Sequence, residues 1–596
     1  MSADFKVSYV KPDKPGIVFT SKEIYLSVDT KGHEDAGILL YDEMGEVYSY
    51  PFPVSKRNGT LAGVKIKRHG CEKFVYNYYI NDKIVTDPYA PSILGLEVWG
   101  GAKAQPRETK GILQSAAFDW KKDYKLRIPY KDSIIYGLNV RSFTMDPSSG
   151  VKHKGTFEGV MEKIPYLKSP GITAVELMPC YEYEECLFSD EVSKMRLNCW
   201  GFQKGFYFAP KASYSSIGDA VLSFKTMVKS IHEAGMEVLM QFYFPEGIKQ
   251  IYMLEVLKYW TTEYHVDGFK ITGHNLPYRL FLEDEVLKDV KLHFEYLPEQ
   301  EEPILSAERL WKNVSVDGKG FLEDMRRYLK GDEGLIRNLM FHQRTNPNKY
   351  AVIHAMADYQ GFSLYDLVSY EYKHNEDNRE ENRDGSDRNY SWNCGVEGVT
   401  RKTSVQKLRL SQMKNALALV FLSQGTPYLF SGDELANTRE GNNNAYCQDN
   451  ETFWVNWKET KRSQEIFKFT KELIKLRKNH EILHMQNYFM GLDIKGLGVP
   501  DISYHGVEAW KPDLGYMSRM IGIMLWGPCA DEKEASFYLA YNMHWEEHQM
   551  ALPKLPAGKK WVKCLDTFSD ELTEISEDAV ITLKPRSIVV CESKSS

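Results

Sequence analysis

Residues 236–271 read MEVLMQFYFPEGIKQIYMLEVLKYWTTEYHVDGFKI, and they decide the fold. They hold an apolar run at 236–241, a stretch of helical periodicity at 254–264 and a second apolar run at 266–271. This order indicates two parallel strands joined by a crossover helix. Earlier in the chain the same order recurs, with apolar runs at 134–140 and 174–179 and helical stretches at 157–167 and 220–232. Because the pattern continues over about 300 residues, we predict an α/β fold, a (β/α)8 TIM barrel in place of a doubly wound sheet.

Both flanks of this region have the pattern of antiparallel β-sheet. Before residue 125, short alternating runs such as 37–41 and 74–80 are separated by turn residues. After residue 500, short β runs return, for example at 536–541. We therefore predict an N-terminal β-sandwich at 1–125, the barrel at 126–500 and a C-terminal antiparallel β-domain at 501–596.

Composition excludes several classes of protein. The 596 residues include 75 basic and 82 acidic side chains, a net charge of −7 that argues against nucleic acid as a partner. We find no apolar stretch of the roughly 18 residues that a membrane span needs, and no secretory signal at the start. Nine cysteines without metal-type or disulfide-type spacing predict reduced thiols in a cytoplasm. Export by a leaderless route is the alternative that these observations leave open.

The sequence has no cofactor motif, and its aromatic content fits either sugar binding or an ordinary core. Neither a nucleotide-type glycine-rich loop nor a metal-spaced His/Cys cluster is visible, so we predict no cofactor and no metal. Aromatic residues make up 13% of the chain. Aromatic faces suit the apolar faces of sugar rings, but they also dominate ordinary protein cores.

Six segments carry a family signature. They are YGLNVRSFT at 136–144, NCWGF at 198–202, GFSLYDLVSY at 361–370, NRDG at 382–385, GDE at 432–434 and GNNNAYCQDN at 441–450. In this order they resemble barrel segments of the isoamylase and glycogen-debranching (pullulanase-type) branch of the α-amylase superfamily. The resemblance implies that the N-terminal β-sandwich is of the starch-binding type. It also implies that the charged insertion at 375–400 lies beside the substrate cleft, whereas its composition alone favours a solvated loop.

The resemblance further implies where catalysis would occur, and most of those positions are substituted. Retaining glycoside hydrolysis needs two carboxylates about 5–5.5 Å apart. The family places them after the fourth and fifth barrel strands and places a third acid after the seventh. Lys270 and Thr272 stand at the arginine and nucleophile positions of the fourth-strand motif. Tyr359 and Gln360 stand at the histidine and transition-state-stabilising aspartate positions near the seventh strand.

One family acid is predicted to remain. Glu308, in the segment 306–309, matches the general acid/base after the fifth strand, and we expect it to pair with Lys270. The third-strand motif is replaced by residues 241–246, which run from Gln241 to Glu246. A relocated catalytic pair of Glu246 and Glu308 is the alternative to a degenerate site. Asp358 is interpreted as a polar residue deeper in the barrel.

These substitutions favour three hypotheses about function. The first is a non-catalytic protein of glycogen or starch metabolism that binds an α-glucan or malto-oligosaccharide, or that partners an active debranching enzyme. The second is an active glycoside hydrolase on α-1,6 or α-1,4 glucans, and the third is a protein-interaction scaffold without sugar affinity. Five aromatic residues are candidates for stacking on sugar rings: Trp200, Phe202, Trp311, Tyr359 and Trp392.

Overall fold

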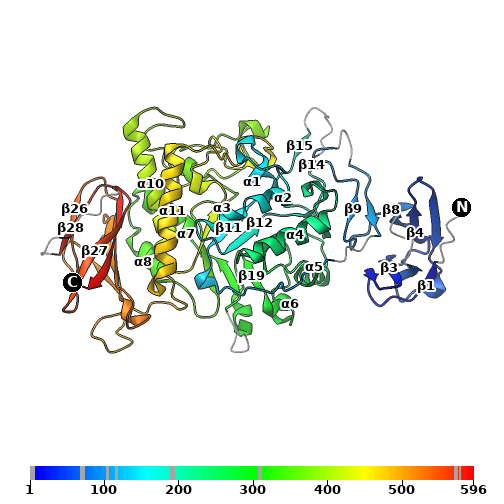
Figure 1. Cartoon of the computed structure of the whole chain (residues 1–596), viewed down its shortest axis with the longest axis horizontal. Helices are drawn as coiled ribbons and strands as arrows, with labels where there is room; N and C mark the ends of the chain where they lie inside the picture. Colours follow the sequence, from blue (N-terminus) through cyan, green and yellow to red (C-terminus); the bar gives the residue numbers. More distant parts are fainter. Residues whose placement is uncertain are drawn as a thin grey trace.

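A computed structural model of the chain describes residues 7–67, 74–101, 106–113, 118–187, 195–305, 312–569, 575 and 579–595. Three parts follow one another along its longest axis (Figure 1). A β-sandwich lies at the end that holds the N-terminus, a barrel lies in the middle, and a second β-domain holds the C-terminus. The three predicted parts are therefore present in the predicted order.

The central part is a closed barrel of parallel strands, which confirms the predicted fold class. The strands, in their order around the barrel, are β11 (Ile135–Leu138), β12 (Ala174–Leu177), β17 (Glu237–Phe244), β18 (Gly268–Gly273), β19 (Lys291–Phe294), β20 (Val314–Asp317), β21 (Ala351–His354) and β22 (Thr426–Phe430). Strand β22 pairs with β11 and closes the ring. Both faces of these strands are covered, which explains their near-continuous apolar sequences.

Helices surround the barrel. They include α2 (Phe157–Glu162), α3 (Ile164–Lys168), α4 (Ala220–Glu233), α5 (Gln250–Glu263), α6 (Tyr278–Glu283), α7 (Phe321–Lys330), α8 (Ile336–Arg344), α10 (Thr403–Leu422) and α11 (Lys461–Asn479). Helix α4 begins where Asp219 accepts a hydrogen bond from the backbone N–H of Leu222, a standard N-cap. It packs on α5 through Phe224, whose ring centroid lies 5.0 Å from that of Trp260. No helix among the described residues is both long enough and apolar enough to cross a membrane.

The N-terminal sandwich consists of two antiparallel sheets. One contains β1 (Ser8–Val10), β6 (Leu61–Lys67), β3 (Glu23–Asp29) and β2 (Gly16–Phe19). The other contains β5 (Val47–Pro51), β4 (Ala36–Tyr41), β7 (Val75–Ile80), β10 (Lys110–Ile112) and β9 (Ile93–Leu94), with β8 (Lys83–Val85) on β7. The Tyr252 hydroxyl on helix α5 donates to the Pro88 carbonyl at 2.7 Å, so the sandwich contacts the barrel directly.

The C-terminal β-domain packs on the barrel through helix α10. Its larger sheet contains β23 (Ile502–His505), β24 (Met520–Leu525), β25 (Phe537–Asn542), β29 (Ser587–Ser595) and β27 (Lys559–Asp566), and its smaller one pairs β26 (His548–Ala551) with β28 (Val580–Leu583). The Asn415 side chain of α10 donates to the Arg586 carbonyl at 2.8 Å. The domain boundaries at 125/126 and 500/501 fall between these elements and stay predictions.

Candidate functional site

The carboxyl ends of the barrel strands bring together the side chains of a candidate site, which we call the mouth. Enzymes with this fold place their active sites at this end. Gln241 lies on β17, Lys270 and Thr272 on β18, His293 on β19 and Asp317 at the end of β20. Sequence patterns predicted the first three of these positions but not His293 or Asp317.

Lys270 is the central charge of the mouth. Its side chain is buried, and its Nζ lies 3.8 Å from Asp317 Oδ1 and 3.8 Å from Asp358 Oδ2. Burial alone would lower the pKa of the Lys270 ammonium, but the charges of Asp317 and Asp358 outweigh burial and raise it above its usual value. Lys270 is therefore a permanent cation that compensates two carboxylates. The predicted pairing of Lys270 with Glu308 stays a prediction, because Glu308 lies outside the described residues.

His293 lies between two carboxylates of the same group. Its Nε2 lies 2.9 Å from Asp317 Oδ1, and its Nδ1 lies 3.8 Å from Glu176 Oε2. Burial alone would lower the pKa of His293, but Asp317 and Glu176 raise it above its usual value. Burial would raise the pKa of Asp317, yet Lys270 and His293 lower it to about 2. The Gln241 amide donates to Glu176 Oε1 at 2.6 Å, and Glu176 is a buried carboxylate of the barrel interior.

Asp358 lies after strand β21, not on it, which corrects the prediction of a residue deep in the barrel. Because the chain leaves the strand at His354, Asp358 can turn back toward Lys270. The Tyr428 hydroxyl donates to Asp358 Oδ1 at 3.1 Å, and the Tyr359 backbone N–H donates to the same oxygen at 2.6 Å. Burial raises the pKa of Asp358, and Lys270 offsets part of that rise.

Thr272 ends the row of β18 side chains at the mouth. Its residue is buried, and its hydroxyl donates to the Phe242 carbonyl at 3.3 Å. A carbonyl oxygen is not a base that could activate a hydroxyl for attack. Gln360, which is exposed, stands beside the mouth with a neutral amide. Thr272 and Gln360 therefore supply a neutral hydroxyl and a neutral amide, and neither supplies a carboxylate.

Three of the aromatic candidates contact one another at the mouth. The Tyr359 ring stacks on Phe202 with centroids 4.8 Å apart and meets Trp200 edge-on at 5.1 Å. Trp200 and Tyr359 are only 6% and 8% exposed, so most of their surface is used for packing. Phe202 is half-buried, and of the three it leaves the most surface for a ligand.

A fourth aromatic candidate lies apart from this group. Trp392 lies under the Arg586 guanidinium, whose carbon is 4.3 Å from the ring centroid, at the junction with the C-terminal domain. This contact uses part of the Trp392 ring for packing between domains, and its predicted contact with a sugar stays a prediction. Trp311 lies outside the described residues.

Comparisons with known proteins identify the family. No family model matches the chain. Isoamylase 1, chloroplastic, from Oryza sativa subsp. japonica is 29% identical over 586 residues, which cover 82% of this chain and 71% of that protein. A glycogen operon protein GlgX homolog from Mycobacterium tuberculosis (strain ATCC 25618 / H37Rv) is 29% identical over 596 residues, 81% of either chain. The chain belongs to the isoamylase and glycogen-debranching branch of the α-amylase superfamily.

Solved structures share the fold of this debranching-family chain. The apo pullulanase from Paenibacillus barengoltzii superposes with a TM-score of 0.72 at 18% identity, covering 98% of this chain and 94% of that one. The GBS pullulanase SAP in complex with maltotetraose gives 0.73 at 15% identity, covering 98% and 88%. These identities are low, so the likeness concerns the arrangement of the barrel and its β-domains.

The barrel order corrects the predicted fifth strand of this family member. The fifth strand is β19, and the acid that directly follows it is Glu295. The fifth strand therefore ends at Phe294, and the 3-10 helix η7 (Glu299–Leu305) separates it from the segment 306–309. Glu308 itself lies outside the described residues. The signal that could have revealed Glu295 is the apolar run at 290–294, which has the length of a barrel strand and ends in an acid.

Glu295 is also close to the mouth. Its carboxylate is exposed, and its charge contributes, after burial, to the raised pKa of Tyr359. Glu246, in contrast, is an exposed residue beyond the end of β17. The acid that the barrel places at the end of its fifth strand is therefore Glu295, and the pair of Glu246 with Glu308 stays a prediction.

Buried asparagines anchor the charged insertion at 375–400, while most of its charged side chains are exposed. The Asn375 amide donates to Asn443 Oδ1 at 2.8 Å, and the Asn378 amide donates to Asp384 Oδ2 at 2.7 Å. Asn375, Asn378 and Asn443 are all buried. The bond to Asn443, and a second one from the Asn378 amide to the Asn444 carbonyl at 2.9 Å, tie the insertion to the family segment at 441–450.

Two groups among the described residues have metal-ligand chemistry, and neither is at the mouth. One contains Glu184 and Glu185, which already pair with Arg107 at 2.6 and 2.8 Å. The other contains His544, Glu546 and His548 in the C-terminal domain. There, the Glu546 backbone N–H donates to His544 Nδ1, so this ring nitrogen is already engaged.

Proposed function

We propose that this protein is a non-catalytic member of the debranching family that binds α-glucans and acts beside an active debranching enzyme of glycogen or starch metabolism. The observation that carries the proposal is the charge arrangement around Lys270. At the end of β18, where the family resemblance places a nucleophile, the chain has Thr272 with its hydroxyl bonded to a carbonyl. The neighbouring carboxylates of Asp317 and Asp358 are engaged by Lys270.

Such an arrangement opposes retaining hydrolysis on physical grounds. The reaction needs one free carboxylate to attack and a second to donate a proton. A carboxylate held by a buried cation is a weaker nucleophile, because attack would separate the ion pair. Loss of one member of a catalytic unit commonly costs on the order of 10⁴ in rate. Here the nucleophile position and the stabiliser position are both neutral.

Sugar binding is supported by the setting of the mouth. Two pullulanases with this fold are described in complex with maltotetraose, and both superpose over 98% of this chain. The mouth of this chain presents hydrogen-bonding groups, and Phe202 presents a half-exposed ring. Polar groups beside an aromatic face are the surface that a glucose ring fits. We expect a malto-oligosaccharide to contact Phe202, Gln360 and Glu295, outside the buried ion pairs.

An active hydrolase is the second candidate, because Glu295 survives at the end of the fifth strand. With its exposed carboxylate it could donate a proton to a leaving group. A nucleophile would then have to come from another acid near the mouth. This candidate predicts turnover that disappears in the Glu295→Gln variant.

Calorimetric titration tests the binding half of the proposal. The wild-type chain is titrated with maltoheptaose, and cellohexaose serves as a β-linked control. We expect saturable binding of maltoheptaose alone, weakened at least severalfold by Phe202→Ala. Flat titrations with maltoheptaose, glycogen and pullulan would contradict glucan binding and would favour a protein-interaction scaffold without sugar affinity.

A further inference from the structure

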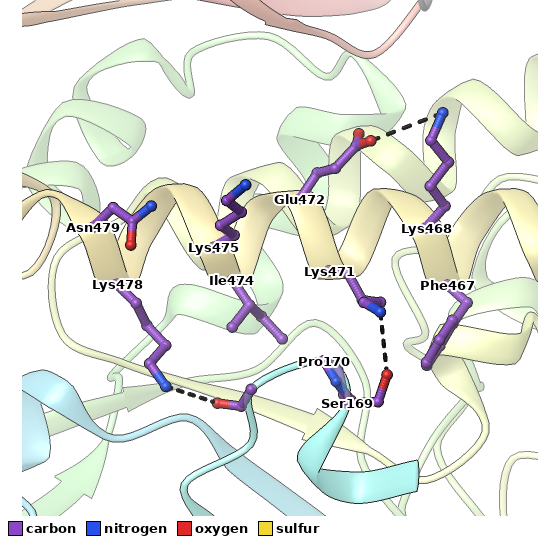
Figure 2. A pocket seen from close by; sticks show the side chains of 11 residues that line it. Ser169, Pro170, Phe467, Lys468, Lys471, Glu472, Ile474, Lys475, Lys478 and Asn479 are labelled. Atoms are coloured by element: carbon purple, nitrogen blue, oxygen red, sulfur yellow. Dashed lines mark hydrogen bonds and ion pairs between the residues drawn. The ribbon is translucent and has the colours of Figure 1, made fainter.

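A groove with basic walls runs along helix α11, far from the carboxyl ends of the barrel strands. Its volume is about 620 Å³, and it lies between α11 and the turn of Ser169, Pro170 and Gly171 that follows α3 (Figure 2). This turn precedes strand β12, which begins at Ala174. The groove is therefore near the starting ends of the strands, whereas the mouth is at the opposite end.

Helix α11 concentrates positive charge in an acidic protein. The chain carries a net charge of −7, but α11 holds seven basic and two acidic residues. Four lysines line the groove: Lys468, Lys471, Lys475 and Lys478. From the first to the last they span ten residues, a distance of about 15 Å along the axis at 1.5 Å per residue.

These lysines are largely uncompensated by acids. Lys471 donates to the Ser169 hydroxyl at 3.1 Å, and Lys478 donates to the Gly171 carbonyl at 3.4 Å. Both partners are neutral, so these bonds orient the ammonium groups and leave their charge available. Lys468 lies 3.8 Å from Glu472, a separation at which an exposed ion pair contributes little. Within the described part of the chain, Lys475 has no ion pair, and it is exposed.

The floor of the groove is apolar and firmly held. Phe467 stacks on Tyr166 with centroids 5.2 Å apart and planes at 20°. Ile474 and Pro170 are buried beside it. Figure 2 shows Phe467 and Ile474 directed to the same side of α11 as Lys471 and Lys478, toward the turn. A ligand in this groove thus meets apolar surface and ammonium groups together.

We propose that the α11 groove docks an acidic segment of a partner protein. A single phosphate would reach one or two neighbouring ammonium groups, whereas a linear polyanion can pair with four groups spread over about 15 Å. Alternating acidic and apolar side chains on such a segment would match the lysines and the apolar floor. The inference rests on the proposed function, since it supplies the surface by which a non-catalytic subunit joins an active enzyme while its mouth stays open to glucan.

The test measures fluorescence anisotropy of a fluorescein-labelled 12-residue peptide that alternates Glu and Leu. The groove variant carries Lys468→Glu, Lys471→Glu, Lys475→Glu and Lys478→Glu. A matched control carries the same charge change at exposed lysines elsewhere, namely Lys319→Glu, Lys349→Glu, Lys402→Glu and Lys407→Glu. We expect the groove variant to bind at least tenfold more weakly than the control, and wild-type affinity to fall as salt rises.

Three results would overturn the inference. Equal losses in the two variants would show a general charge effect. Equal binding of a peptide with Gln in place of Glu would remove the charge argument, and displacement by submillimolar inorganic phosphate would indicate a small-anion site. Calorimetry of the same variants with maltoheptaose separates this inference from the proposed function. Lost peptide binding with glucan binding intact concerns the groove, whereas flat glucan titrations in wild type concern the function.

Discussion

Replacing Lys270 by methionine should destabilise the barrel, because the substitution leaves Asp317 and Asp358 without their shared cation. Removing one partner of a buried ion pair costs about 3–5 kcal/mol. Both separations are 3.8 Å and the Asp317 side chain is 45% exposed, so part of the lost charge interaction is replaced by water. We therefore expect a loss of about 2–3 kcal/mol in the free energy of unfolding at pH 7.

Urea unfolding, followed by circular dichroism, measures this loss. In the wild type the pKa of Asp317 is lowered from 3.8 to about 2, so its ion pairs stabilise the fold above pH 3.8 and lose this effect as pH falls toward 2. The difference between wild type and Lys270→Met should thus be full at pH 5 and smaller at pH 3. Lys270→Arg retains the charge and serves as the control. Equal stabilities at pH 7, or a difference that does not shrink at pH 3, would refute the reasoning.

Three further substitutions test other parts of the structure. Burial alone would lower the pKa of His232, but its partners Asp267 and Asp123 raise it from 6.5 to about 9. The stabilisation by these ion pairs is therefore present below pH 6.5 and is lost as pH rises through about 9. In denaturant titrations, His232→Gln should lower the free energy of unfolding by roughly 2–3 kcal/mol at pH 6 and by little at pH 10. Tyr359→Ala removes the ring stacked on Phe202 and should lower the free energy of unfolding by about 3 kcal/mol, and an unchanged urea midpoint would contradict the packing. Trp392→Ala should cost about 2 kcal/mol in the free energy of unfolding through lost packing with Arg586 and should leave maltoheptaose affinity unchanged. A weakened affinity would instead support a contact between Trp392 and sugar.

The barrel was predictable because its strands are buried on both faces. Runs such as 236–241 and 266–271 are apolar almost throughout, and a helical stretch separates them. The family resemblance placed Lys270 and Thr272 on the fourth strand, and both lie on β18 in the structure. Linear order and periodicity thus indicate which residues end a strand.

The partners of those residues could not be predicted in the same way. Lys270 pairs with Asp317 and Asp358, which lie 47 and 88 positions further along the chain and meet it only when the barrel closes. The fifth strand was misplaced because an acid at 308 resembled the family motif, while the true strand ends at Phe294 and precedes Glu295. A motif of two or three residues has too little information to outweigh a strand run.

Sugar-contacting aromatic residues also could not be predicted from the sequence alone. A ring that stacks on sugar and a ring that packs in a core have the same sequence signature. Trp200 and Tyr359 pack against each other at 5.1 Å, and Trp392 packs under Arg586. Burial decides between the two uses, and burial depends on segments distant in sequence.

The most direct test of the account is a reducing-end assay at high protein concentration with glycogen, amylopectin, pullulan and maltoheptaose. Wild type is compared with Glu295→Gln, which removes the acid after the fifth strand, and with Glu308→Gln. The account predicts equal and negligible rates in all three proteins. Turnover by the wild type that disappears in Glu295→Gln or Glu308→Gln would contradict it and would show that this chain is a working glycoside hydrolase.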